Sequence, residues 1–114
     1  MDRKILVALH KNEVAPRFDL ATEALLVTVT DQGEVLESKT LLLAHASGDD
    51  LCDLALNKDA GAVVCGAIEE EYYHYLRWKR VDVLDSVVGP VDAVLERLRR
   101  GELRAGDVLF PREA

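Results

Sequence analysis

The sequence predicts one small α/β domain over residues 1–114, with a mixed five-stranded β-sheet and flanking helices. Two observations predict this fold class. The first half holds short runs rich in β-branched residues, separated by turn residues, which is typical of antiparallel strands. The second half alternates short apolar runs with amphipathic helical stretches, which is typical of parallel strands joined by helices. The expected order is therefore β-β-β-α-β-α-β-α.

Three strands are expected before the first helix. Residues 5–9 form a continuous apolar run, Ile-Leu-Val-Ala-Leu, as expected for a strand buried on both faces. A polar loop at residues 11–17 follows. Residues 24–30 and 35–43 read as two strands, and the turn at residues 31–34 between them contains a glycine. These two strands predict a β-hairpin.

Three amphipathic stretches predict helices. Ser47 is the expected N-cap of the first helix, which we expect Gly61 to end. The second begins with the acids of residues 69–71, which favour a helix N-terminus. The third begins with Pro90 at its first helical position and has Gly101 as its C′ residue. The remaining two strands are predicted at residues 62–65 and 81–84.

The second helix contains most of the aromatic side chains of the chain. We expect Tyr72 and Tyr75 to face the core with Leu76, because the three share one helical face. Tyr73 and Trp78 lie off that face. They predict a contact surface for a partner protein or for a second copy of the chain.

Composition excludes several classes of partner. The formal net charge of −7 repels nucleic-acid backbones, so no nucleic-acid partner is expected. Apolar runs are far shorter than the roughly 20 residues that span a bilayer, and no signal-peptide pattern is present. We therefore expect a cytoplasmic protein without a membrane partner. With 49% hydrophobic residues, the chain can form a core without disulfides or a structural metal.

Three segments of the sequence resemble the dinitrogenase iron–molybdenum cofactor biosynthesis family, the NifX/NifB-type domain. Residues 13–19, Glu-Val-Ala-Pro-Arg-Phe-Asp, are similar to the family's loop after its first strand. Residues 62–68 look like its strand that ends in a small-residue turn. Residues 88–103 look like its closing helix and terminal Gly-Glu-Leu. The resemblance extends from Lys4 to about Leu109 and implies a ribonuclease H-like fold.

The resemblance implies a non-enzymatic protein that carries or stores a metal–sulfur cluster, or its precursor, during cofactor assembly. The cluster would be of the iron–sulfur or iron–molybdenum type, and a cofactor-assembly protein or self-association would be the partner. In some members a histidine before the loop phenylalanine is thought to hold the cluster. Arg17 occupies that position here, and Asp19 replaces the usual glycine. The alternative is a small regulatory or interaction module that has lost cluster binding.

Two candidate site residues lie at or just after the first strand, where pockets of open α/β sheets form. Arg17 can hold an anionic cluster with its guanidinium group, or it can form a surface ion pair with Asp19 or Glu13. His10 can ligate a metal, or it can simply end its strand.

Two further candidates end the strand at residues 62–65. Cys65 can supply a soft thiolate ligand, with Gly66 directly after it, or it can be a small core residue. Cys52 falls on the buried face of its helix. Both cysteines are expected to be free thiols, and two cysteines cannot supply the four thiolates of an iron–sulfur cluster.

Acidic residues and missing motifs complete the prediction. The acids at residues 69–71 oppose an anionic cargo, and they can either bind a hard divalent ion or simply begin a helix. Nuclease chemistry is not expected, because residues 5–9 lack the acids that hold two metal ions. No Ser/His/Asp arrangement, phosphate loop or HExxH motif is present, so no enzymatic activity is expected.

Overall fold

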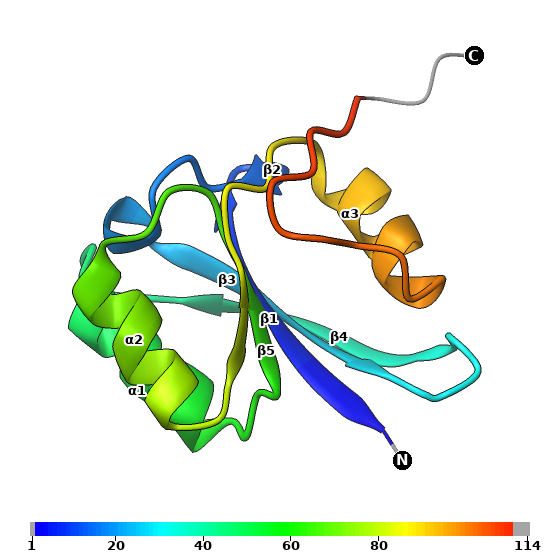
Figure 1. Cartoon of the computed structure of the whole chain (residues 1–114), viewed down its shortest axis with the longest axis horizontal. Coiled ribbons are helices and arrows are strands. Elements are labelled where there is room, and N and C mark those ends of the chain that lie inside the picture. The colour runs from blue at the N-terminus through cyan, green and yellow to red at the C-terminus, as the bar shows by residue number, and fades with distance from the viewer. Residues whose placement is uncertain (1, 111–114) are drawn as a thin grey trace.

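A mixed β-sheet with helices on both faces forms the body of the protein (Figure 1). The computed structural model describes residues 2–110. The strands lie in the order β4-β3-β1-β5-β6, with the short β2 paired to β1 beside this path. In chain order the elements are β1 (Arg3–His10), β2 (Glu13–Val14), the 3-10 helix η1 (Phe18–Leu20), β3 (Glu23–Val29), β4 (Val35–Leu42), α1 (Gly48–Asn57), β5 (Ala62–Val64), α2 (Glu70–Trp78), β6 (Asp82–Leu84) and α3 (Val91–Arg99).

The strand directions confirm the predicted division of the sheet. Strands β1, β3 and β4 pair antiparallel, and β1, β5 and β6 pair parallel. The mixed α/β class and the three helices are confirmed as well. The two-residue strand β2 was not predicted: it folds the segment after β1 back onto β1, through the pairs Leu9–Val14 and His10–Glu13.

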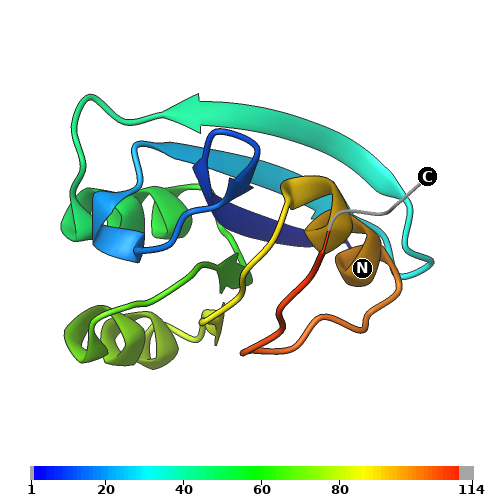
Figure 2. The ribbon, with the colours of Figure 1, turned by 90° about the horizontal axis from the view of Figure 1, so that it is seen from above.

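Strand β1 is the centre of two apolar layers. Leu6 and Ala8 point into the cluster beneath α1 and α2, whereas Ile5, Val7 and Leu9 point into the cluster beneath α3 and the C-terminal segment. This alternation is the consequence of the two-residue repeat of a strand. Figure 2 shows α1 and α2 grouped together and α3 apart from them. Each fully buried side chain of this kind contributes about 1.5–3 kcal/mol to stability.

Two predicted helix ends are confirmed by their hydrogen bonds. The Ser47 hydroxyl accepts a hydrogen bond from the Asp50 amide at 3.2 Å, as an N-cap does. Gly101 follows α3 with φ of 68°, and its amide donates to the Leu98 carbonyl at 3.0 Å. The next amide donates to the Arg97 carbonyl at 2.9 Å, which completes a Schellman motif.

Two other predicted helix ends are wrong. Helix α1 ends at Asn57 rather than near Gly61, because Asp59 already takes a left-handed φ of 56°. Pro90 is not the first residue of α3 but the residue before it, with an extended ψ of 147°. The reason is a tertiary contact: the Val91 amide donates to the Asn12 carbonyl at 2.8 Å, which ties this segment to the loop after β1.

None of the helices within residues 2–110 combines the length and the apolar character that crossing a bilayer requires.

Candidate functional site at the carboxyl ends of the parallel strands

The loops that follow β1, β5 and β6 meet at one end of the sheet. Because these three strands are parallel, their carboxyl ends lie at the same edge, where ligand sites of open α/β sheets form. We call this edge the carboxyl rim and define it as residues 10–18, 65–67 and 85–90. All four predicted site residues belong to it: His10, Arg17, Cys65 and Gly66.

The loop after β1 is hydrogen-bonded to the turn after β5 along its length. The Gly66 amide donates to the Ala15 carbonyl at 3.1 Å, and the Ala67 amide donates to the Pro16 carbonyl at 2.8 Å. In return, the Phe18 amide donates to the Ala67 carbonyl at 2.8 Å. The rim is therefore covered by backbone of residues 15–18 rather than open.

Gly66 is required by this close approach. A Cβ atom at this position would lie 2.5 Å from the Ala15 carbonyl oxygen and 2.7 Å from the Pro16 carbonyl carbon, and closer still to the Pro16 oxygen. All three atoms belong to backbone, which cannot turn aside as a side chain can. The structure thus gives Gly66 a packing role, which the sequence analysis did not assign to it.

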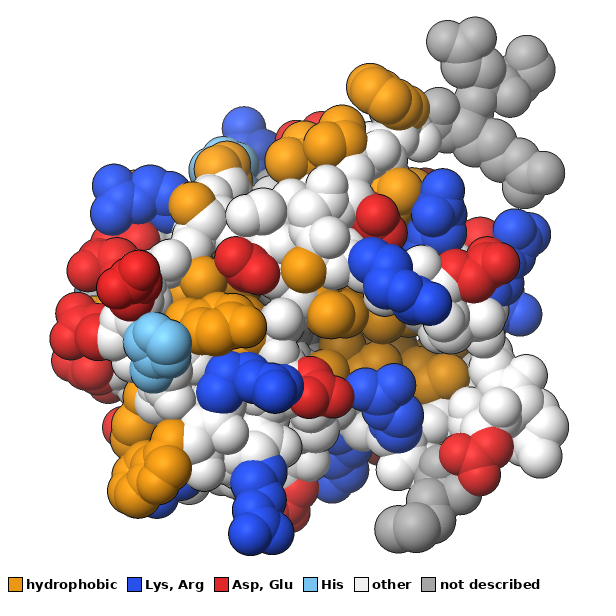
Figure 3. Space-filling model, viewed as in Figure 1, with side chains coloured by type: hydrophobic (Ala, Val, Ile, Leu, Met, Phe, Trp, Pro, Cys, Tyr) orange, Lys and Arg blue, Asp and Glu red, His pale blue; other side chains and the backbone are white. Residues whose placement is uncertain are grey.

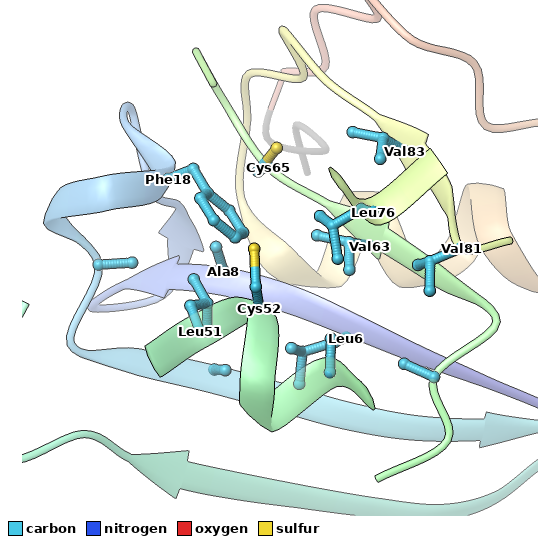
Figure 4. Close-up of a cluster of buried hydrophobic side chains, with 14 of the residues drawn as sticks. Leu6, Ala8, Phe18, Leu51, Cys52, Val63, Cys65, Leu76, Val81 and Val83 are labelled. Atoms are coloured by element: carbon cyan, nitrogen blue, oxygen red, sulfur yellow. The ribbon is translucent and has the colours of Figure 1, made fainter. Parts of the chain in front are cut away.

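Cys65 lies beneath the covering loop. Its side chain is fully buried, and Figure 4 shows it in the same apolar cluster as Phe18 and Cys52. Burial, and secondarily the charge of Asp85, raise the pKa of the Cys65 thiol to about 12. The pKa of Cys52 is also raised to about 12, by burial and then by Asp49 and Asp53. Both cysteines are free, as predicted, and both are protonated at neutral pH.

Arg17 forms the ion pair that was one of its two expected roles. Its guanidinium donates to both carboxylate oxygens of Asp19, at 3.2 Å from Nε and 2.8 Å from the terminal nitrogen. The Arg17 side chain is 53% exposed, so the pair faces solvent. Its backbone is bridged to Ala67, which brings Arg17 beside Gly66. An anion at this position has to compete with the Asp19 carboxylate.

His10 lies at the outer end of the rim. It is exposed, pairs with Glu13 across the β1–β2 turn, and precedes Lys11, which has a left-handed φ of 58°. Within residues 2–110, no group of three or more His, Cys, Asp or Glu side chains is arranged to hold a metal ion.

A shallow acidic hollow of about 430 Å³ lies between α1 and α2, beside the rim. Asp49, Asp53 and Glu71 line it together with Tyr72. Burial raises the pKa of Tyr72, and the charges of Asp49 and Glu71 raise it further. Figure 3 shows acidic side chains gathered on the side of the molecule where α1 and α2 lie. Of the acids at residues 69–71, Glu71 lines this hollow, where carboxylates would oppose an anionic ligand.

The orientation of α2 differs from the prediction in two residues. Tyr73 packs against the core with Tyr72 and Leu76, although it was expected to point away. Tyr75 is exposed, although it was expected to be buried. Helix α2 is thus rotated relative to the predicted face. Trp78 is 74% exposed, as expected, and its ring lies 4.6 Å from the Lys79 ammonium.

A second hollow, of about 310 Å³, lies at the opposite, amino-terminal end of the parallel strands. Val83, Leu98 and Leu103 contribute apolar surface to it, and the arginines Arg3, Arg77 and Arg104 surround them. Figure 3 shows an apolar hollow bordered by basic side chains on this face of the molecule. Arg77 is partly neutralised by Asp82, at 2.7 Å. The sequence did not indicate this hollow, because its arginines come from three distant segments.

These features define a small α/β protein with a mixed sheet and a loop-covered carboxyl rim. The chain belongs to the dinitrogenase iron–molybdenum cofactor family, whose model matches residues 3–101, and this confirms the resemblance. A comparison with curated protein sequences gave no match.

Solved structures share the fold. The crystal structure of a protein designated PH0822 has a TM-score of 0.80 at 15% identity, over 90% of this chain and 93% of that one. A proposed dinitrogenase from Methanocaldococcus jannaschii has a TM-score of 0.72 at 19% identity, again over 90% and 93%. A proposed NifB protein from Thermotoga has a TM-score of 0.64 at 15% identity, over 98% and 99%. At these identities the likeness establishes the fold alone.

Proposed function

We propose that this chain is a non-enzymatic protein of metal–sulfur cofactor assembly, and that it carries an iron–sulfur or iron–molybdenum cluster, or a precursor, as cargo. The observation that carries the proposal is the family match over residues 3–101, which includes every segment of the carboxyl rim. The rim is the proposed docking place, because its loops present His10 and Arg17 to solvent.

The donor atoms of the rim favour loose binding. His10 is an exposed imidazole that can ligate iron without any rearrangement. Arg17 can stabilise an anionic cargo once its pair with Asp19 opens. Cys65 can ligate iron only if the loop at residues 15–18 lifts and the thiol loses a proton held with a pKa of about 12. A protein that passes its cargo to a cofactor-assembly partner benefits from such weak attachment.

The second candidate is a regulatory or interaction module that has lost the cargo. The observation that favours it is the donor set itself: within residues 2–110 no three ligating side chains converge. The basic hollow around Arg3, Arg77 and Arg104 suits an acidic segment of a partner protein on this reading.

Anaerobic isolation and reconstitution with iron and sulfide, followed by iron and sulfide analysis, separates the two candidates. The carrier hypothesis predicts that the wild-type protein binds iron, that His10→Ala binds none and that Arg17→Ala binds a smaller amount than the wild type. The control is His45→Ala, which removes an exposed histidine outside the rim and should bind as much iron as the wild type. Cys65→Ser should also keep its bound iron, as long as the loop at residues 15–18 stays closed over this position. A wild-type protein that takes up no iron supports the interaction module.

We also propose a ribonuclease H-like name for this fold, a cytoplasmic location and the absence of catalytic activity. Membership of the family supports the fold name and the non-enzymatic role. The two free thiols support a reducing compartment.

A further inference from the structure

Strand β4 borders the sheet, and within the described chain no strand lies on its outer side. Figure 2 shows β4 running along the outside of the molecule, and no helix or loop of residues 2–110 covers its outer edge. Every residue of β4 except Leu41 is exposed. A long, uncovered edge strand offers unpaired backbone donors and acceptors to a further strand.

We propose that β4 pairs with β4 of a second copy of the chain, antiparallel and centred on Ser38. In a two-fold symmetric pair of this kind, directly opposite side chains must lie on the same face of the sheet. Because successive residues alternate between the faces, the two-fold axis has to pass beside a residue and not between two residues. Three such registers place a residue of the charged segment 37–39 on the axis, namely Glu37, Ser38 or Lys39.

The charges of β4 select one of these registers. With Ser38 on the axis, Glu37 of each copy lies opposite Lys39 of the other, which gives two attractive pairs. With Lys39 on the axis two lysines oppose each other, and with Glu37 on the axis two glutamates do. Opposite charges across strands stabilise pairing and like charges oppose it. Glu37 and Lys39 are both exposed and available for this pairing.

The register shift between β3 and β4 falls at Leu36, because Thr28 pairs with Glu37 whereas the next residue of β3, Val29, pairs with Val35. This bulge breaks the alternation of β4 before Glu37, so Val35 lies on the opposite face of the sheet from Leu41. From Glu37 to Leu42 the pairing with β3 is regular. The three pairs that the proposal needs, at residues 37–39, lie within this regular part of the strand.

This association is independent of the proposed cargo. Strands β3 and β1 separate β4 from β5 and β6, so pairing at β4 leaves two of the three rim loops untouched. The surface also differs from the aromatic surface of α2 that the sequence suggested. Both copies would share one continuous sheet through a single symmetric contact.

Sedimentation velocity of the full chain over a range of concentrations tests the proposal. Wild-type protein is expected to shift from monomer to dimer as the concentration rises. Glu37→Lys or Lys39→Glu is expected to weaken the dimer by about tenfold or more, because each change creates two like-charge pairs. The double exchange Glu37→Lys with Lys39→Glu is expected to restore it. Glu102→Lys, which alters the net charge as Glu37→Lys does, is the control and should leave the dimer intact.

A cross-linking variant tests the register directly. Ser38→Cys places identical thiols on the axis and should form a disulfide-linked dimer on oxidation with copper phenanthroline, whereas Lys39→Cys should not. The native thiols of Cys52 and Cys65 are buried and should not contribute. A chain that stays monomeric at every concentration overturns the proposal. A dimer that is insensitive to both charge reversals and that does not cross-link through Ser38→Cys overturns it as well.

Discussion

Replacement of Gly66 by alanine is the most informative single perturbation of the rim. The added Cβ would lie 2.5 Å from the Ala15 carbonyl oxygen and 2.7 Å from the Pro16 carbonyl carbon. Real Cβ atoms do not approach backbone so closely, so the loop at residues 15–18 has to lift. The substitution therefore acts on the cover of Cys65 without altering any polar side chain.

The cost follows from the contacts that lifting breaks. Three backbone hydrogen bonds join the loop to residues 66 and 67, and each contributes about 1 kcal/mol. Phe18, which is fully buried, loses packing as well. We expect Gly66→Ala to lower the free energy of unfolding by about 2–4 kcal/mol.

Urea denaturation followed by circular dichroism measures this loss, and reaction with a thiol reagent in native buffer measures the exposure of Cys65. Gly61→Ala is the matched control, because its Cβ would meet the Lys4 carbonyl oxygen at 3.8 Å, an ordinary contact distance. The control should stay within about 0.5 kcal/mol of wild type. If Gly66→Ala proves as stable as Gly61→Ala and Cys65 remains unreactive, the covered rim is wrong.

Three further predictions concern stability. Arg80 takes a left-handed φ of 66° at the end of α2, so Arg80→Gly should raise the free energy of unfolding by about 0.5–1 kcal/mol in urea denaturation. Folding raises the thiol pKa values of Cys52 and Cys65 from 9.0 to about 12, so the folded chain keeps protons that the unfolded chain releases. Stability should therefore be intact below pH 9 and fall between pH 9 and 12, by about 1.4 kcal/mol per thiol and pH unit; a flat profile there contradicts the burial argument. The exposed pair of Arg17 with Asp19 should contribute less than about 1 kcal/mol in a double-mutant cycle.

Local patterns in the sequence were sufficient for most of the fold. The unbroken apolar run at residues 5–9 predicted a central strand, because both faces of β1 are covered. Ser47 and Gly101 marked helix ends through side-chain or backbone preferences that act within a few residues. These local preferences predict the helix ends correctly because no contact with a distant segment overrides them.

Other features depend on distant contacts and could not be predicted. The hydrogen bonds between residues 15–18 and 66–67 join backbone groups, which carry no sequence signal of their own. Arg80 ends α2 where glycine would be expected, since the surrounding turn imposes its conformation. Tyr73 and Tyr75 face the opposite way to the prediction. Tyr72 packs against Phe18 of η1 and Gly48 of α1, and these contacts with distant segments set the rotation of α2.

The most direct test of the carrier hypothesis is the amide NMR spectrum of the protein after anaerobic reconstitution with iron and sulfide. A paramagnetic cluster broadens the signals of nearby amides. We predict broadening at residues 10–18, 65–67 and 85–90, with the signals of residues 35–39 in β4 unaffected. Unchanged signals at the rim when iron and sulfide are supplied, or broadening centred on another surface, would contradict the proposal that the cargo docks there.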